Sequence, residues 1–484
     1  MTRHRARLLG SAVLALALGA ALRLWFIAHA AIPSGDTLLY GDIALSWMKY
    51  GIYGFSQPPG LPAPTLIRLP GYPLFLMLCF RLFGAEHYTA VLYVQCVIDL
   101  LACLLLADLA RRLFGNRAAL LTLSLAALCP FTSSYVAASL TETLTCATIT
   151  LAFYALARWR PSRTDAPSRW TPWNRWLWIL SAACACSILL RPDEGLLAAA
   201  VLPALVVLDW RRSLVLSRRA LPLLAASLCT ILPLVPWTIR NARTFHVFQP
   251  LAPRSAVDPG EPVPTGFYRW YRTWAVDFSS TEDIYWNYDG AAIQIADLPS
   301  RAFDSAAQFD QTAAILRDYN LTTKPSPELD TRFDTLARDR IDVHPIRYYL
   351  VLPVARLGNM LFRPRTELLA TPLDWWRFHE HRGKTAFAFA YAALNLAYFV
   401  AGGLGFYRWT RGSPSRSAPL AWSMLAFVAL RCALLLTLDN SEPRYTLEFF
   451  PILIVGIAAL LKQSRLQIAA STSTTPAACA AEKS

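Results

Sequence analysis

The feature that most constrains this chain is a succession of apolar segments, each about as long as a helix that crosses a membrane. The hydrocarbon core of a bilayer requires about 20 mostly apolar residues per helix. By that measure the sequence predicts ten spans, near residues 8–30, 86–110, 118–136, 139–158, 175–191, 194–209, 219–238, 384–407, 418–438 and 445–461. Only 16% of the 484 residues are charged, against about 25% in soluble domains. We therefore predict an all-α polytopic membrane protein with about 10–11 transmembrane helices.

The distribution of charge predicts which loops face the cytoplasm. The chain carries 46 Lys+Arg and 32 Asp+Glu, and residues 242–383 contain 16 of these bases and 18 of these acids. The positive excess therefore lies in short loops between apolar segments, which is typical of cytoplasmic loops and not of a nucleic-acid surface. Alternation from a cytoplasmic N-terminus places every strongly basic short loop inside, around Arg111–Arg117, Arg158–Arg175, Arg211–Arg219, Arg408–Arg416 and Lys462–Arg465.

Two polar stretches remain on the outer side, and they divide the chain into predicted domains. Residues 1–241 form an N-terminal transmembrane module that includes a large first outer loop, 31–85. Residues 242–383 form an extracytoplasmic segment, and 384–465 supply the C-terminal transmembrane helices. The polar residues 466–484 are predicted to be a disordered cytoplasmic tail.

Apolar periodicity predicts helices within the extracytoplasmic segment. Ser300–Tyr319 and Pro327–Val343 are helical stretches, and in the second the apolar side chains repeat at helical spacing, at Leu329, Phe333 and Leu336. The segment 345–362 is long enough for an eleventh span. Spanning, however, would expose its arginines to lipid and place the Arg408–Arg416 loop outside. We therefore predict an amphipathic helix on the outer interface.

The cysteines, and the lack of several familiar motifs, exclude other classes of protein. Nine of the ten cysteines lie in apolar stretches, and Cys479 lies in the tail, so the sequence does not predict a disulfide scaffold. The sequence has no G-x-G-x-x-G, P-loop or G-x-S-x-G motif, which argues against a nucleotide-sugar donor and against serine hydrolysis. The pair His379 and His381 could bind zinc only with further ligands, and no metal site is predicted.

Candidate catalytic carboxylates lie where apolar segments meet the outer side. Asp36 and Asp42 follow the first predicted span, and Glu142 opens the fourth. A carboxylate at the membrane surface can act as general base towards an acceptor hydroxyl or amine. The alternative is a helix cap for Asp36 and a solvated position for Asp42. Asp99, inside the second span, is predicted to make a buried hydrogen bond between helices.

Arginines gather on the same side of the membrane. Arg68 directly precedes Leu-Pro-Gly-Tyr-Pro, a rigid turn that could aim its guanidinium at a lipid phosphate. The alternative is an arginine that extends to the interface around an apolar stem. Arg191, Arg240 and Arg444 also lie at outer ends of apolar segments, and Glu194 follows closely on Arg191. The shared face of these acids and bases predicts one outer site.

In this order the motifs resemble those of the polyprenyl-phosphate-sugar-dependent GT-C glycosyltransferases. The branch is that of the dolichyl-phosphate-mannose-protein mannosyltransferases, which includes the bacterial aminoarabinose transferases of lipid A. The similar elements are a first-loop acid followed by Tyr, Ala and Gly, then Arg-x-Pro-Gly-Tyr-Pro, and the Thr-Glu that opens the fourth span. They continue with Leu-Arg-Pro-x-Glu at 190–194, Pro-Trp-x-x-Arg-Asn at 236–241 and a late Arg-Tyr, covering about residues 5–245 and 440–460.

The resemblance implies a GT-C-like helical bundle and an inverting hexosyl or pentosyl transferase whose donor is a sugar on undecaprenyl or dolichyl phosphate. It implies that Asp36 serves as base or orients the acceptor, that Arg68 binds the donor phosphate and that Glu142 is a second acid. Many relatives have adjacent acids in the first loop, but here Thr37 follows Asp36, so the choice between Asp36 and Asp42 stays open. Further contacts to the donor phosphate are expected from Arg191, Arg240 and Arg444, and side chains lining the substrate from Tyr40, Tyr72, Glu194 and Tyr445.

No cofactor is implied, because polyprenyl phosphate is a good leaving group, and a requirement for a divalent metal stays open. The expected partners are the lipid-linked sugar donor, a lipid, glycan or protein acceptor, and membrane lipids, without nucleic acid. The expected location is a bacterial inner membrane, with the site facing the periplasm. Two alternatives remain: an O-antigen ligase or polymerase that uses a pyrophosphate-linked glycan, and a lipid-linked-sugar transporter, for which repeated halves would be expected.

Overall fold

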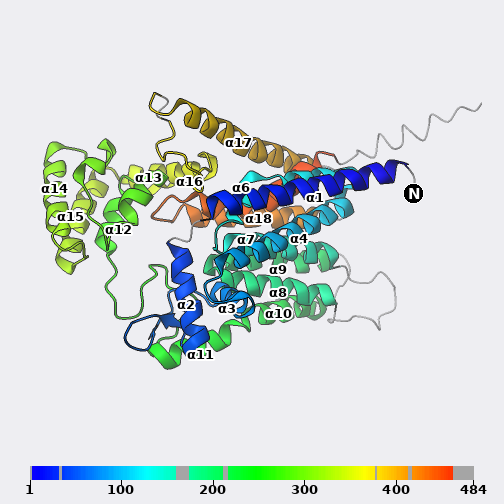
Figure 1. Ribbon diagram of the computed structural model, residues 1–484, viewed down its shortest axis with the longest axis horizontal. Helices are drawn as coiled ribbons and strands as arrows, with labels where there is room; N and C mark the ends of the chain where they lie inside the picture. The colour runs from blue at the N-terminus through cyan, green and yellow to red at the C-terminus, as the bar shows by residue number, and fades with distance from the viewer. Residues whose placement is uncertain are drawn as a thin grey trace, which may run out of the picture.

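Apolar helices make up most of the chain, and the computed structural model describes residues 3–31, 35–159, 174–210, 216–376, 379–411 and 417–461. In this described part, four helices are long and apolar enough to cross a membrane: α1 (Arg3–Ala30), α4 (Tyr88–Phe114), α17 (Arg382–Arg411) and α18 (Ala418–Leu435). The bent pair α10 and α11 would make a fifth span. The chain is a mostly helical, multi-pass membrane protein, and Figure 1 shows its long helices side by side in one bundle.

Shorter helices occupy the other predicted spans. They are α5 (Asn116–Ala127), α6 (Pro130–Tyr135), α7 (Glu142–Arg158), α8 (Arg175–Leu190), α9 (Gly195–Trp210), α10 (Leu216–Ile231), α11 (Leu234–Phe245) and α19 (Phe449–Ala459). The full count of ten or eleven spans therefore stays a prediction. Four predicted basic loops lie wholly or partly outside the described residues, at 160–173, 211–215, 412–416 and 462–465, as does the predicted tail, 466–484.

Two of the predicted spans are interrupted, both at prolines. The predicted span 118–136 is divided, because α5 ends at Ala127 and α6 begins at Pro130. Proline lacks the amide hydrogen that would continue a helix, but it suits the first helical position. The predicted span 219–238 is bent by 41° where α10 gives way to α11, next to Pro233.

Glycines allow α17 and α19 to pack with their backbones in contact. A Cβ atom at Gly405 would overlap the carbonyl oxygen of Gly456, and one at Gly402 would lie 3.0 Å from the carbonyl oxygen of Leu453. Small residues at such a crossing let membrane helices approach closely and gain dispersion contacts. The last helix is thereby held firmly against α17.

The segment predicted as the first outer loop, called here the first outer segment, is folded into helices and a short hairpin. It contains α2 (Asp36–Tyr50), the short antiparallel strands β1 (Gly54–Phe55) and β2 (Ala63–Pro64), and α3 (Gly71–Phe83). The strands pair Gly54 with Pro64 and Phe55 with Ala63. Helix α3 has 13 residues, too few to cross a bilayer, and its apolar face packs on α2 with Tyr72, Leu76 and Phe80.

The second outer segment has a core of its own. Its helices are α12 (Thr265–Arg272), α13 (Phe278–Ser280), α14 (Ala306–Asn320), α15 (Pro327–Val343) and α16 (Leu352–Phe362). Short 3-10 turns in this segment cover Ile295–Asp297 and Ser300–Ala302, and π-helical turns cover Thr281–Tyr285 and Arg347–Val351. Two other 3-10 turns lie elsewhere in the chain, at Pro192–Glu194 and Pro443–Thr446. Figure 1 shows α12, α14 and α15 beyond one end of the bundle, away from the N-terminal end of α1.

The helices predicted in this segment are present. The bounds of α15 match the prediction, and its repeating side chains are buried in the segment's core at Leu329, Phe333 and Leu336. The predicted stretch Ser300–Tyr319 begins as a 3-10 turn and becomes helical from Ala306. Around 345–362 the structure exposes apolar Ile346 and Tyr349, each 70% exposed.

A buried ion pair joins α1 to α4. The Arg23 Nε donates a hydrogen bond to Asp99 Oδ2 at 2.7 Å, and Arg23 Nη1 donates to the Ala127 carbonyl at 2.6 Å. The predicted interhelical hydrogen bond of Asp99 is therefore confirmed. Its partner, Arg23, went unnoticed in the sequence.

Candidate active site

Asp36 is the first residue of α2, and its carboxylate joins two arginines from distant parts of the chain. Its Oδ1 accepts a hydrogen bond from Arg68 Nη2 at 2.8 Å, and its Oδ2 accepts one from Arg444 Nη2 at 2.9 Å. Gly35, just before the helix, has a φ of 51°, which glycine adopts without strain. The side chains of Asp36 and Arg68 are each 22% exposed and that of Arg444 is 17% exposed, so the pairing is open to solvent.

The two arginines set the charge of Asp36. Burial alone would raise the pKa of Asp36, but the guanidinium groups of Arg444 and Arg68 outweigh burial and hold its pKa well below the ordinary value. Hydrogen bonds to the charged form act in the same direction. Asp36 is therefore ionised at neutral pH, and it is a weak base for as long as both arginines hold it.

The turn before α3 positions Arg68. The side chains of Leu66 and Leu69 are buried on either side of it, and the Tyr53 hydroxyl donates to the Arg68 carbonyl at 2.9 Å. The Arg68 guanidinium lies 5.8 Å from the centre of the Tyr40 ring, within cation–π range. Within the described part of the chain, the buried Nε of Arg68 has no hydrogen-bond partner.

Arg444 reaches the same place from the 3-10 turn Pro443–Thr446. Its guanidinium forms ion pairs with Glu442 and, at 3.8 Å, with Glu142 at the start of α7. Both glutamates are nearly inaccessible, and in each the Oε2 atom has no partner among the described residues. Burial raises the pKa of Glu442 despite the opposing charge of Arg444. These carboxylates hold the Arg444 guanidinium towards Asp36.

The ion pairs continue inward through Arg191, at the end of α8. Its Nη1 lies 3.4 Å from Glu142 Oε1 and 3.7 Å from Glu448 Oε1, and its Nε lies 3.2 Å from Asp193 Oδ1. The Tyr445 ring centre is 5.2 Å from the Arg191 guanidinium. Arg191 thus connects the outer pairs to the interior of the bundle.

Arg431 forms the inner end, and the sequence analysis missed it. It lies in α18, is fully buried, and pairs with Asp193 at 3.0 Å, Glu194 at 2.8 Å and Glu448 at 2.9 Å. A single arginine within an apolar helix was the available signal, because such charges usually face a partner inside the bundle. Glu448, which lies immediately before apolar α19, gave a similar signal and was also missed.

We call this connected set the charged network. It joins six carboxylates to four guanidinium groups: Asp36, Glu142, Asp193, Glu194, Glu442 and Glu448, with Arg68, Arg191, Arg431 and Arg444. Six of these ten residues are among those that the sequence predicted for the site. The network brings together segments from both ends of the chain.

Two predicted residues lie elsewhere and hold the first outer segment together. Asp42 Oδ2 accepts a hydrogen bond from the Ser56 amide at 2.9 Å, next to the hairpin. Arg240 donates to the carbonyls of Thr65 at 2.7 Å and Tyr53 at 2.6 Å. Neither side chain forms an ion pair with the charged network.

The predicted tyrosines differ in their access to the site. Tyr40 packs edge to face on Tyr72 at 5.1 Å and lies near Arg68. Tyr72 is fully buried, and its hydroxyl donates to Gln95 Oε1 at 2.8 Å. Tyr445 lies between two arginines of the network, with Arg444 at 5.8 Å and Arg191 at 5.2 Å from its ring centre. Tyr40 and Tyr445 are therefore the better placed to contact a ligand.

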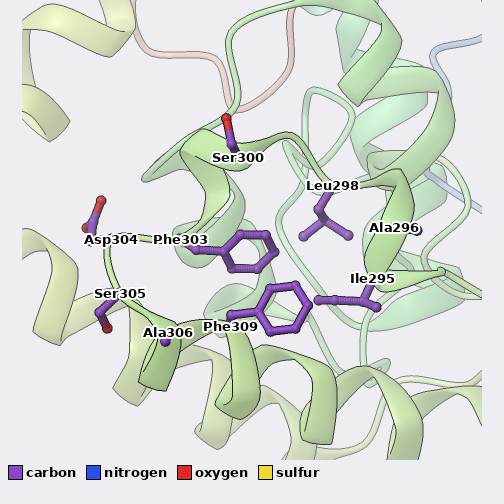
Figure 2. A pocket seen from close by; sticks show the side chains of 9 residues that line it. All are labelled: Ile295, Ala296, Leu298, Ser300, Phe303, Asp304, Ser305, Ala306 and Phe309. Atoms are coloured by element: carbon purple, nitrogen blue, oxygen red, sulfur yellow. The ribbon is translucent and has the colours of Figure 1, made fainter.

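A surface hollow lies apart from the network, and the described residues offer no metal site. Within the described ranges, no three His, Cys, Asp or Glu side chains are grouped so that they could hold a metal ion. A hollow of about 640 Å³ lies in the second outer segment, where Phe303 and Phe309 face each other beside Asp304 (Figure 2). Asp304 is paired with Arg347 at 2.6 Å, so this hollow is mainly apolar.

Comparison with known proteins finds a family that part of the chain matches. Residues 63–237 match the family dolichyl-phosphate-mannose-protein mannosyltransferase. No curated protein sequence matches the chain. Among solved structures, the archaeal oligosaccharyltransferase AglB from Archaeoglobus fulgidus is similar, with 11% identity and a TM-score of 0.51, over 98% of this chain and 52% of that one. The apo form of the Archaeoglobus fulgidus oligosaccharyltransferase gives 12% identity and a TM-score of 0.51, over 96% and 52%.

A weaker likeness is to ArnT from Cupriavidus metallidurans, with 17% identity and a TM-score of 0.39, over 89% of this chain and 78% of that one. The chain spans about half the length of the oligosaccharyltransferase structures. The resemblance to GT-C glycosyltransferases that the motifs predicted is confirmed by the family match and by the shared fold.

Proposed function

We propose that this protein is an inverting glycosyltransferase that moves a sugar, a hexose or a pentose, from a polyprenyl phosphate to an acceptor on the outer face of the membrane. The observation that carries this proposal is the placement of Asp36 between Arg68 and Arg444, at 2.8 and 2.9 Å. A carboxylate beside two guanidinium groups combines a proton acceptor with a phosphate-binding pair.

Arg68 and Arg444 are the proposed ligands of the sugar donor's phosphate. A phosphate presents oxygens to guanidinium groups much as the Asp36 carboxylate does. Arg191 lies deeper and is neutralised by Asp193, Glu142 and Glu448, so we assign it to holding the network together. Arg240 is occupied with carbonyls.

Binding of the donor would also activate the base. When the phosphate takes the two guanidinium groups, Asp36 loses the charges that keep its pKa low, and it gains an anionic neighbour. Asp36 can then accept the proton of the acceptor's hydroxyl or amine as that group attacks the anomeric carbon. The bond from that carbon to the phosphate oxygen breaks, and polyprenyl phosphate leaves with the electron pair, stabilised by the arginines.

The topology proposed for this reaction keeps the charged network and residues 242–383 outside. The basic loops then face the cytoplasm, and the donor lies in the outer leaflet of a bacterial inner membrane. Helix α16 and the turn before it, which expose Ile346 and Tyr349, would lie on the membrane surface. The family that residues 63–237 match is named for a dolichyl-phosphate-mannose substrate, and AglB was solved with a dolichol-phosphate. Both names support a lipid-linked donor for this chain.

The test measures release of polyprenyl phosphate from undecaprenyl-phosphate hexoses and pentoses by the full-length protein in nanodiscs. Asp36→Asn keeps the shape but removes the basicity, so transfer should fall at least about 100-fold while thermal stability stays nearly unchanged. Asp42→Asn is the matched control on the same helix and should retain most of the transfer, because its carboxylate only accepts the Ser56 amide.

Other outcomes would correct the proposal. Transfer that survives Asp36→Asn but not Asp42→Asn would move the base by six residues. Loss in neither variant would leave Glu142 as the candidate base. Release of a pyrophosphate from a pyrophosphate-linked glycan, with none from the monophosphate sugars, would favour the ligase or polymerase alternative.

A further inference from the structure

Arg363 is a buried cation for which the described part of the chain supplies no carboxylate. It follows α16 and is 6% exposed. Its Nε donates to the Pro364 carbonyl at 3.3 Å, and its guanidinium lies 4.8 Å from the centre of the Phe278 ring. The residue before a proline is held extended, and Arg363 has φ −63° and ψ 158°. This backbone fixes the direction of the side chain.

Two neighbouring arginines show what is unusual about Arg363. Arg365 is equally buried, but it donates to the Pro443 carbonyl at 2.8 Å, to Thr446 Oγ1 and to Asn395 Oδ1 at 3.3 Å. Arg356 has two unpartnered nitrogens, Nε and Nη2, and both are sealed from solvent. The two Nη groups of Arg363 donate to no described residue, yet they are not among the sealed atoms. They therefore face a space that solvent reaches.

An unpaired buried charge of this kind is costly unless a ligand neutralises it. Burial lowers the pKa of Arg363, and the acids that oppose this, such as Glu367 and Asp277, form no ion pair with it. Charges buried without a counter-ion are destabilising. A site that binds an anion explains why a chain would keep one.

Arg363 lies close to the charged network without belonging to it. Through Arg365 its segment is bonded to Pro443, the residue before Arg444. Through Glu367 it is bonded to the Tyr135 hydroxyl at 2.9 Å, and Tyr135 lies within electrostatic reach of Glu142 and Arg444. Arg363 therefore lies two residues from a side chain that is bonded to the turn carrying Arg444.

We propose that Arg363 binds a second phosphate group of the substrates, separate from the one assigned to Arg68 and Arg444. The identity of the first phosphate rests on the proposed function. The second phosphate has two possible sources. A phosphomonoester carried by the acceptor agrees with the proposed monophosphate donor, whereas the distal phosphate of a polyprenyl pyrophosphate would replace that donor and overturn the proposed function. Both sources present a phosphate group with one or two negative charges to the Arg363 guanidinium.

The experiment compares wild type with Arg363→Gln in nanodiscs, using the full chain and three probes. The probes are undecaprenyl monophosphate, undecaprenyl pyrophosphate, and a hexose 1-phosphate added to protein saturated with the monophosphate. If the source is the donor, Arg363→Gln should weaken the binding of the pyrophosphate at least about tenfold and the binding of the monophosphate less than about twofold. If the source is the acceptor, Arg363→Gln should weaken the binding of hexose 1-phosphate alone, again at least about tenfold.

Thermal unfolding without ligand separates binding from folding. Arg363→Gln should melt at or above the wild-type temperature, because it removes an unpaired buried charge. Arg365→Gln is the structural control and should melt lower. Arg347→Gln, which removes the ion pair with Asp304, should leave all three affinities unchanged.

The proposal is overturned if Arg363→Gln leaves all three probes unaffected, or if it melts lower than Arg365→Gln. It is also overturned if Arg363→Gln weakens the monophosphate as strongly as Arg68→Ala, since Arg363 would then belong to the first phosphate site. Failure of the wild type to bind undecaprenyl monophosphate would instead count against the proposed function. In that case, the affinity for hexose 1-phosphate without the monophosphate, compared between wild type and Arg363→Gln, would still test the role of Arg363.

Discussion

The two ends of the charged network contain the same kinds of ion pair but differ in their access to solvent. At the inner end, Arg431, Glu194 and Glu448 are all 0% exposed. At the outer end, Asp36 is 22% exposed and Arg444 is 17% exposed. A sealed pair cannot lose one partner without leaving a bare charge, whereas a pair in contact with solvent can exchange a partner for water or a ligand. The inner end therefore supports the fold, and ligands can enter at the outer end.

The largest effect is expected from breaking the inner end. Arg431→Leu leaves Glu194 buried without its cation and leaves Glu448 only the longer pair with Arg191 at 3.7 Å, which should lower the free energy of unfolding by about 3–5 kcal/mol. Chemical unfolding in detergent measures this loss. Adding Glu194→Gln and Glu448→Gln to Arg431→Leu should restore much of it. Wild-type stability in the single variant would show that the inner end does not support the fold.

Breaking the outer end should affect the ligand more than the fold. Arg68→Ala should weaken binding of undecaprenyl phosphate by about 2–5 kcal/mol, because a partly buried phosphate loses its charged partner. Arg68→Lys should recover only part of the affinity, since an amine lacks the planar fork. Titration calorimetry in nanodiscs gives both values. An unchanged affinity in Arg68→Ala would leave Arg68 an ordinary interfacial arginine.

The pH dependence should reveal the exchange of partners at Asp36. In the free protein its pKa lies below the ordinary value, so its carboxylate stays charged as pH falls below about 3.9. Its contribution to stability is complete above that pH and is lost progressively as pH falls towards the lowered pKa. In the donor complex the pKa should be higher, so kcat should decline on the acid side at a higher pH than kcat/KM for the sugar donor. Coinciding acid limbs would mean that Asp36 keeps its arginines throughout the reaction.

The smallest effect should come from an ion pair outside the network. Lys324 and Asp289 are 67% and 57% exposed and pair at 3.1 Å. Lys324→Ala should change the free energy of unfolding by about 0–1 kcal/mol and should leave transfer unchanged. A larger loss would show that exposure does not explain the difference between the two ends of the network.

Local pattern was enough to predict most of the helices and the outer end of the site. The charged residues at the ends of apolar segments, such as Asp36, Arg68, Glu142 and Arg444, lie together as their shared face predicted. A measure based on bilayer thickness found the long helices, but it missed α3, whose 13 residues are too few to span. The same measure predicted one continuous span across Pro130, but a new helix, α6, begins at that residue.

Pairing between distant residues was beyond the sequence. Arg431 and Glu194 lie 237 positions apart, and nothing in either local pattern names the other. Arg240 shows the opposite case, because its place at the outer end of a helix resembles that of Arg444. Its partners are backbone carbonyls of the first outer segment, which no pattern of side chains reveals. Which arginine meets a carboxylate is decided by how the helices pack.

The bond between Asp36 and Arg444 joins residues that are 408 positions apart, and this spacing has a consequence for how the protein is made. Ribosomes add about 5–20 residues per second, so Asp36 and Arg68 exist for roughly 20–80 s before Arg444 has been synthesised. During that interval the nascent chain holds half of the proposed phosphate-binding pair and cannot complete the charged network. Insertion of α19, locked to α17 through Gly405 and Gly456, is therefore the step at which a growing chain can complete that network.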